Sequence, residues 1–447
     1  MRIATLQLSP RLGDVEGNIR RADRLLEVLE RRVKGRGWGG SGAGINAGGS
    51  GGGLLDVLVL PEMAFSGYNF PSLKAIKPYL EPTEAGPTAQ WARAAARRLG
   101  CVVCVGYPEM AKAEGNGNGE GKDKENPSMS MSTNTTTETT SEPPPLSTLA
   151  ANSNSHANDS TNIDKKAHEP PPRPSEDREK ETPYTCIPKP TTHPNPNFNS
   201  SITITPTGTI LSSYQKRFLY YTDVPWASEG RNGAGFFHLP LTTTEPQTEP
   251  QTEPQTEPQT KTIPTALGIC MDINPYNFTA PPNAYEFANH VLSSGARLVL
   301  LPMAWLTRLG SEELRGARGE PDLETFRYWV ERFWPVVRGC VDGSGEGETV
   351  LVFANRVGEE GGGVRIGGDG DGDGVARYAG SSCVVGVRRR GDKRGNGGEK
   401  VDLDEVDIVV WEMLGRAEEG VCLVDTEEEP RMVFRMRGGS GSDSDSE

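Results

Sequence analysis

Apolar and aromatic side chains are scarce in this chain. Only 34% of its 447 residues are hydrophobic and 7% are aromatic, which is low for a globular protein. The deficit is local, because long polar tracts account for it and roughly 300 residues of ordinary composition remain. That remainder is enough for one large domain with a single core.

The sequence also lacks the apolar segments that direct a chain to a membrane. No run approaches the length of about eighteen apolar residues that a membrane-spanning helix needs. The first residues, MRIATLQLSP, contain neither the apolar core nor the cleavage site of a secretory signal. We therefore expect no membrane partner and a cytoplasmic location, with the nucleus and the mitochondrion left open.

Positive charge and histidine are in short supply too. The formal net charge is −14, which argues against nucleic acid or an anionic membrane as the main partner. Of the 5 histidines, His156, His168 and His193 lie in or near the longest polar tract, so a Cys–His–Asp triad is hard to build. The 7 cysteines are odd in number and scattered, which favours a reducing compartment over a disulfide framework.

Cys101 and Cys104 have the CxxC spacing of zinc and redox sites. They lie in a Val-rich segment with no second pair and no histidine nearby, so we interpret them as structural. Alternation along a strand would place the two sulfurs on opposite faces. We expect no metal and no cofactor.

Polar and glycine-rich tracts divide the chain without splitting it into separate cores. Such tracts cannot bury enough apolar surface to order themselves, and loops tolerate added length at small cost. We therefore expect a single domain over residues 1–430 and an acidic disordered tail at 431–447. Flexible insertions are expected within the domain at 35–53, 111–182, 241–262, 358–374 and 388–400.

Between the tracts, apolar runs of strand length alternate with helical patterns. The alternation predicts an α/β fold with a mixed, layered sheet. Helices are expected at residues 18–34, 87–99, 282–293 and 323–338. Strands are expected at 3–8, 54–60, 101–106, 201–205, 209–214, 266–269, 297–303, 349–355, 378–387 and 420–425.

Three chemically useful residues stand at the ends of such strands. Cys270 follows an apolar run and precedes a turn, so it occupies a strand-to-helix elbow. An elbow of this kind points backbone N–H groups at the sulfur, which lowers the thiol pKa and can hold an oxyanion. The alternative is a small buried hydrophobic residue. Glu62 and Lys216 would complete a hydrolytic site, as general base and as oxyanion-stabilising ammonium.

Several segments give the chain a family resemblance. It resembles the nitrilase superfamily of carbon–nitrogen hydrolases in LPEMAFSGY (60–68), YQK (214–216), GICMD (268–272), FANRVGEE (353–360) and YAGSSCV (378–384). The resemblance implies a four-layer αββα sandwich and a Glu–Lys–Cys triad of Glu62, Lys216 and Cys270. It also implies a thioester at Cys270 and an oxyanion hole formed by Lys216 and the backbone N–H of Met271.

Within the superfamily, the chain is similar to the protein N-terminal amidase branch. The segments are KRFLYYTDVPWASEG (216–230), GICMDINPYNF (268–278) and LPMAWL (301–306). The branch implies conversion of N-terminal Asn or Gln of proteins to Asp or Glu, with release of ammonia, in the N-degron pathway. Many family members use a second glutamate near the lysine, and Glu229 is the candidate here, with Asp223 as the alternative.

A protein N-terminus as substrate needs a carboxylate for its α-ammonium and a pocket open to a chain. Asp223 or Asp272 would supply the charge, although Asp272 is also placed to cap a helix. Asn274 would hydrogen-bond the substrate. The remaining candidates are three aromatic residues that would line the pocket: Trp226, Tyr276 and Trp305. The position of Trp305 after a strand is equally consistent with a core residue.

Other functions remain open from the sequence. A small-molecule ω-amidase, carbamoylase or nitrilase would use the same triad, and a catalytically silent scaffold would bind partners through the polar tracts. A redox role would use Cys270 or the Cys101 and Cys104 pair. The sequence decides neither between Asn and Gln nor whether the chain forms homo-oligomers.

Overall fold

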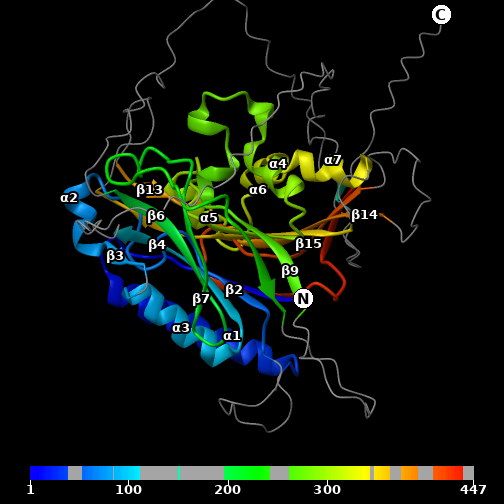
Figure 1. Ribbon diagram of the computed structural model, residues 1–447, viewed down its shortest axis with the longest axis horizontal. Coiled ribbons are helices and arrows are strands. Elements are labelled where there is room, and N and C mark those ends of the chain that lie inside the picture. The colour runs from blue at the N-terminus through cyan, green and yellow to red at the C-terminus, as the bar shows by residue number, and fades with distance from the viewer. Residues whose placement is uncertain are drawn as a thin grey trace, which may run out of the picture.

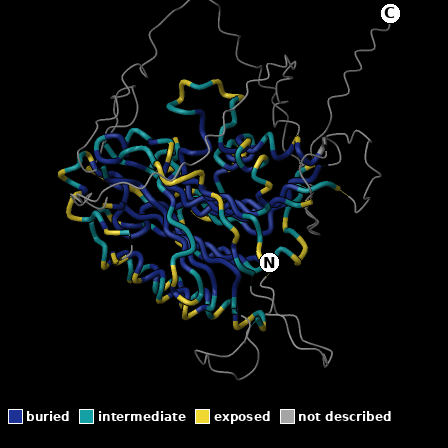
Figure 2. The backbone as a smooth tube through the Cα atoms, viewed as in Figure 1, coloured by how far each residue is buried: buried dark blue, intermediate teal, exposed yellow. Residues whose placement is uncertain are grey.

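Two β-sheets stack face to face in the computed structural model, and helices cover the outer face of each (Figure 1). The strands of both sheets are largely buried, while exposed residues lie on the outer helices and in the loops (Figure 2). This arrangement is the four-layer αββα sandwich expected from the family resemblance. The structure describes residues 1–38, 53–83, 85–110, 150–151, 196–241, 261–342, 347–362, 374–390 and 406–435.

The first sheet is 7-stranded and carries helices α1 and α3 on its outer face. β1, β2 and β4 are parallel, and the other neighbours on its main path are antiparallel. The strands predicted at 201–205 and 209–214 are present, as the antiparallel pair β6 and β7. Its strands run in the order β16 (Gly420–Asp425), β1 (Arg2–Gln7), β2 (Val57–Val59), β4 (Val102–Met110), β6 (Asn197–Ile204) and β7 (Ile210–Gln215), with β3 (Glu81–Pro82) beside β4.

Sequence signals set the ends of the two helices on this sheet. Helix α1 (Val15–Gly35) begins after Asp14, whose carboxylate accepts a hydrogen bond from the N–H of Gly17, as an N-cap does. Helix α3 (Pro87–Leu99) starts with a proline and ends at Gly100, which has a φ of 64°, a backbone angle that glycine adopts without strain. Apolar residues at helical spacing, such as Ala22, Leu26 and Leu29, therefore face the sheet.

The second sheet is 8-stranded, and β9, β10 and β11 are its parallel centre. Helices α4 (Glu286–Ser293), α6 (Leu323–Glu331) and α7 (Trp334–Asp342) cover its outer face. Its order is β5 (Ala150–Ala151), β17 (Met432–Arg435), β15 (Val406–Met413), β14 (Cys383–Arg389), β11 (Thr349–Asn355), β10 (Leu298–Met303), β9 (Thr262–Leu267) and β8 (Phe236–Pro240).

The largest apolar cluster fills the space between the sheets. Cys104 of the first sheet lies in it, whereas Cys101 lies in the cluster beneath α1 and α3. The two sulfurs therefore face different layers, as strand alternation predicts. Both are fully buried, and burial raises the pKa of Cys104 to about 11. Within the described ranges, no group of His, Cys, Asp and Glu is arranged to hold a metal ion.

Short elements complete the fold and lie mostly at the ends of the strands. No helix in the described part of the chain is long and apolar enough to cross a membrane. The short elements are α2 (Leu73–Ile76), α5 (Ser311–Gly316), β12 (Glu359–Glu360), β13 (Ala376–Arg377) and the 3₁₀ turns η1 (Lys77–Tyr79), η3 (Cys270–Ile273), η4 (Tyr276–Phe278) and η5 (Pro282–Ala284).

The structure corrects several predicted boundaries. The expected tail at 431–447 instead contributes β17, because a short apolar run pairs with β15. The predicted helix at 323–338 is two helices, since Pro335 lacks the N–H that would bond the carbonyl of Glu331, where α6 ends. The predicted insertions also overlap with ordered elements, namely α1, β5, β9, β12 and β14. Most of their length and residues 436–447 lie outside the described residues.

Gly106 in β4 gives a test of the packing between β4 and the chain that leaves β2. A Cβ at this position would lie 2.6 Å from the Cα of Glu62 and 2.9 Å from the backbone N of Met63. Gly106→Ala is expected to lower the free energy of unfolding by about 1–3 kcal/mol, because backbone must move. Urea unfolding measures this.

Gly316→Ala in α5 is the matched control, since its Cβ would meet nothing within 4 Å. It should be neutral or slightly stabilising. Equal stability of the two variants would show that β4 can shift freely.

Candidate active site

The three predicted catalytic residues converge at one end of the sandwich. Glu62 follows β2 and Lys216 follows β7, both in the first sheet, whereas Cys270 follows β9 in the second. Glu62 and Lys216 are fully buried, and Cys270 is 7% exposed. The site therefore joins residues from both sheets at the edges where their strands end.

A buried network surrounds the ammonium of Lys216. Its Nζ lies 2.7 Å from Oε1 of Glu62 and 2.7 Å from Oδ2 of Asp223. Asn199 closes the network, donating from Nδ2 to Glu62 Oε1 at 2.6 Å and to Asp223 Oδ1 at 2.9 Å. Glu62 Oε2 accepts no hydrogen bond from any residue of the described ranges and is buried, so one carboxylate oxygen is left for chemistry.

The charges in this network set the protonation states. Burial raises the pKa of Glu62 above that of an ordinary carboxyl group and Asp223 adds to the rise, while Lys216 and Asn199 oppose it. Burial alone would lower the pKa of Lys216, but the carboxylates of Asp223 and Glu62 outweigh it and raise that pKa. Lys216 is thus a fixed cation beside a carboxylate that takes up a proton readily.

Cys270 occupies the elbow expected from the sequence, with a φ of 43° at the first residue of η3. The expected lowering of its pKa is wrong. Burial and the Glu62 carboxylate raise the thiol pKa, while Lys216 and the backbone N–H of Ala304 oppose the rise without cancelling it. The resting sulfur is therefore a thiol, and a base must remove its proton before it can attack.

Asp272 holds the elbow instead of facing substrate. Its Oδ2 accepts from Ile269 N at 2.8 Å and from the hydroxyl of Tyr214 at 2.9 Å. Its Oδ1 accepts from the N–H groups of Arg217, at 3.1 Å, and Phe218, at 2.9 Å. This carboxylate ties the cysteine elbow to the segment after Lys216, and its predicted contact with substrate stays a prediction. Met271 is buried directly after the nucleophile, near the N-terminus of η3.

The second acidic residue near the lysine is Asp223, and the structure gives Glu229 a different place. Glu229 Oε1 accepts from the hydroxyl of Tyr276 at 2.6 Å, whereas Asp223 contacts Lys216 directly. The ion-pair partner of Lys216 is therefore Asp223, the alternative named from the sequence, while the roles of Glu229 in catalysis and of Asp223 towards substrate stay predictions. Sequence spacing could not separate the two, because both lie in the same irregular segment after β7.

The other predicted pocket residues are placed as follows. Asn274 accepts from the hydroxyl of Tyr328 at 2.7 Å, so its side-chain oxygen already has a partner. Trp226 is fully buried rather than forming an open wall. Trp305 is half-buried and its ring lies 5.6 Å from that of Tyr328, and Tyr276 lies against Phe218 with ring centroids 5.1 Å apart.

Asn199 was not singled out from the sequence. The only sign of it is an asparagine inside the strand NFNSSITI, where every residue of β6 is buried. A buried polar residue in a central strand indicates a hydrogen-bonding task. Because side chains alternate along a strand, Asn199 points to the opposite face from Phe198 and Ser200. It is therefore separate from the hydrogen bond that Ser200 donates to Glu109 at 2.6 Å.

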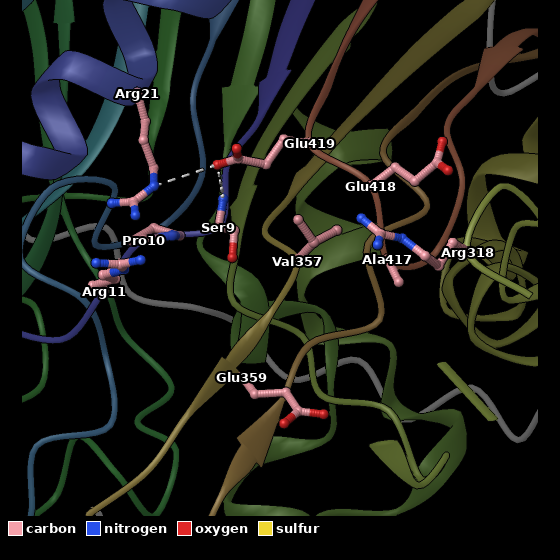
Figure 3. A pocket seen from close by; sticks show the side chains of 10 residues that line it. All are labelled: Ser9, Pro10, Arg11, Arg21, Arg318, Val357, Glu359, Ala417, Glu418 and Glu419. Carbon is pink, nitrogen blue, oxygen red and sulfur yellow. Dashed lines mark hydrogen bonds and ion pairs between the residues drawn. The ribbon is translucent and has the colours of Figure 1, made fainter. Parts of the chain in front are cut away.

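A separate cleft lies between the ends of β1 and β11 and the turn before β16 (Figure 3). Its volume is about 600 Å³, and it is lined by arginines and glutamates around Ser9 and Val357. Glu419 accepts from the N–H of Ser9 at 2.9 Å and approaches Arg21 at 3.9 Å. None of Glu62, Lys216 and Cys270 lines this cleft, so it is not the site of the triad.

Comparison with known proteins identifies relatives of the chain. Residues 2–135 match the family model described as carbon-nitrogen hydrolase. A protein N-terminal amidase of Schizosaccharomyces pombe is 24% identical over 398 residues, covering 86% of this chain and 91% of that protein. One from Saccharomyces cerevisiae is 22% identical over 306 residues, covering 68% of this chain and 45% of that protein.

Solved structures show the same fold. A crystal structure of an N-terminal amidase with a Gln-Val peptide has a TM-score of 0.56 at 17% identity, covering 95% of this chain and 96% of its own. One with an Asn-Glu-Ala peptide also has a TM-score of 0.56 at 17% identity, covering 98% and 99%. Together, these comparisons show that residues 2–135 match the carbon-nitrogen hydrolase family model and that the chain shares the αββα fold of the N-terminal amidase structures.

Proposed function

We propose that this enzyme is a cysteine amidohydrolase that converts N-terminal Asn or Gln of proteins to Asp or Glu and releases ammonia. The observation that carries the proposal is the buried Glu62–Lys216 pair next to the Cys270 elbow. The names of the relatives from both yeasts and the peptides in the similar structures support an N-terminal amide as the substrate. The products are the acidic N-termini of the N-degron pathway.

The first half-reaction forms a thioester. Oε2 of Glu62 takes the proton of the Cys270 thiol as the sulfur attacks the carboxamide carbon. Negative charge develops on the carboxamide oxygen, where Lys216 and the N–H of Met271 stabilise it. The carbon–nitrogen bond then breaks, Glu62 returns its proton to the leaving nitrogen, and ammonia departs.

The second half-reaction restores the enzyme. Glu62, again a carboxylate, takes a proton from water as the water oxygen attacks the thioester carbon. The carbon–sulfur bond breaks, the new carboxyl group leaves as Asp or Glu, and the thiolate recovers its proton from Glu62. The raised pKa of Glu62 suits a group that alternately takes up and gives back a proton, and the fixed charge of Lys216 serves both oxyanions.

Glu229 is the carboxylate that we assign to the substrate's α-ammonium. Asp223 and Asp272 already accept several hydrogen bonds within the chain, whereas the Glu229 side chain has Tyr276 as its recorded partner. Its neighbour Gly230 donates from N to the carbonyl of Lys216 at 2.8 Å, which keeps this segment beside the lysine. A half-buried carboxylate next to the site suits a cationic group at the end of a chain.

Ammonia release from matched peptides tests the function. One peptide begins with free Asn or Gln and the other carries the same residue N-acetylated. We expect release from the free peptide only, and none with Cys270→Ala, because the nucleophile is gone. If glutaramate or a carbamoyl amino acid is hydrolysed while both peptides stay intact, the substrate is a small molecule and the proposal is wrong.

Glu229→Gln tests recognition of the α-ammonium. The variant keeps a hydrogen-bond acceptor for Tyr276 and loses the charge, so KM for the free peptide should rise about 10- to 100-fold with kcat little changed. Glu286→Gln is the matched control, since Glu286 accepts from the backbone N–H of Tyr276 at 3.2 Å. An unchanged KM in Glu229→Gln would move the role to another residue.

Asn199→Leu tests whether the Asn199 amide helps to set the pKa of Glu62. Its amide lowers the pKa of Glu62, and Glu62 works as a carboxylate, so activity is lost as pH falls through that pKa. Removing the amide should raise the pKa and move the acid limb of kcat/KM to higher pH. Ser200→Ala, which loses a buried hydrogen bond to Glu109, should leave the limb in place. A folded Asn199→Leu with an unshifted acid limb would contradict this role.

A further inference from the structure

Tyr68 lies against the catalytic network without a role in the reaction described above. Its side chain is buried, and its ring centroid lies 5.5 Å from Nζ of Lys216. Among the described residues its hydroxyl has no hydrogen-bond partner. The ring stabilises the lysine charge through its face, and the hydroxyl is left unused.

The segment that carries Tyr68 is clamped. Glu360 accepts hydrogen bonds from the N–H groups of Tyr68 and Asn69, each at 3.0 Å. Glu360 is itself held by an ion pair with Arg356 and by the hydroxyl of Tyr378 at 2.6 Å. These contacts join the segment after β2 to β12 and to the chain that follows β11.

Gly67 shows how closely the clamp is packed. Its φ is 79°, and a Cβ there would lie 2.7 Å from Oε1 of Glu360 and 2.7 Å from Cα of Leu12. The backbone before Tyr68 therefore has little room to shift. A buried hydroxyl without a partner costs about 1–3 kcal/mol, a cost that a bound substrate would remove.

The phenol is held in its neutral form. Burial raises its pKa, and the negative charges of Asp223 and Glu62 raise it further. A phenol that stays protonated can donate a hydrogen bond, and its preferred acceptor is an atom that gains negative charge. Glu62 Oε1 already accepts from Lys216 and Asn199, and Glu62 Oε2 must receive the thiol proton.

The carboxamide oxygen is the remaining acceptor. Lys216 commits two of its N–H groups to Glu62 and Asp223, which leaves one for the substrate. We propose that the hydroxyl of Tyr68 donates a further hydrogen bond to the oxygen of the scissile carboxamide, beside Lys216 and the N–H of Met271, so that Tyr68 is a catalytic residue. The assignment rests on the proposed amide hydrolysis, and it extends to the small amides that the same triad would cleave.

Tyr68→Phe is the test, because it removes the hydroxyl and keeps the ring against Lys216. We expect kcat/KM to fall roughly 10²-fold, the usual cost of losing one oxyanion donor, with KM little changed. In a Cys270→Ala background, peptide affinity should be the same with Tyr68 or Phe at this position. The melting temperature should not fall, since no recorded hydrogen bond is lost.

Tyr107→Phe in β4 is the matched control. This phenol is equally buried, and its electrostatic neighbours are Glu109 and Glu81. It should retain full activity. Intact-mass detection of the thioester after rapid mixing should show slower acylation in Tyr68→Phe alone.

Two results would overturn the assignment. One is unchanged kcat/KM in a folded Tyr68→Phe, and the other is a loss that appears wholly as weaker binding in the Cys270→Ala background. The measurements use whichever amide the wild type hydrolyses. Failure of the peptide as a substrate would therefore refute the proposed function and still leave the role of Tyr68 to be decided on glutaramate.

Discussion

The site depends on one buried cation held between two carboxylates. Lys216 is fully buried, and its contacts with Glu62 and Asp223, with Asn199 bridging the two acids, make its charge tolerable there. Removing one partner from a buried ion pair costs about 3–5 kcal/mol. The cluster is therefore costly to bury. It gives the sulfur a rigid electrostatic environment that needs no rearrangement during the reaction.

The two sheets contribute different halves of that environment. The base and the ammonium come from the first sheet and the nucleophile from the second, so their alignment depends on how the sheets are stacked. Asp272 connects the halves, because it bonds both the elbow at Ile269 and the N–H groups that follow Lys216. Glu360 of β12 makes similar contacts between the segment after β2 and the chain that follows β11. Both carboxylates are buried, which strengthens each bond that they accept.

The layered α/β fold and the placing of Glu62, Lys216 and Cys270 at strand ends could be predicted from the sequence, because apolar runs of strand length and the motifs at their ends are local signals. β17 was missed because only its partner β15 makes its short apolar run a strand. The separate roles of Asp223 and Glu229 depend on the path of one irregular segment, and spacing does not encode that path. Asn199 and Tyr68 gain their significance from neighbours more than a hundred residues away in the chain. The thiol pKa was misjudged because the elbow suggested N–H groups, whereas burial and the facing carboxylate dominate.

The state of the sulfur has a consequence for the life of the enzyme in the cell. A covered thiol that keeps its proton reacts slowly with peroxide and with alkylating agents, since the thiolate is the reactive species. Cys270 is protonated at rest beside the base that will deprotonate it. In the proposed reaction an amide therefore meets a sulfur beside its base, whereas an oxidant in solution meets a covered thiol.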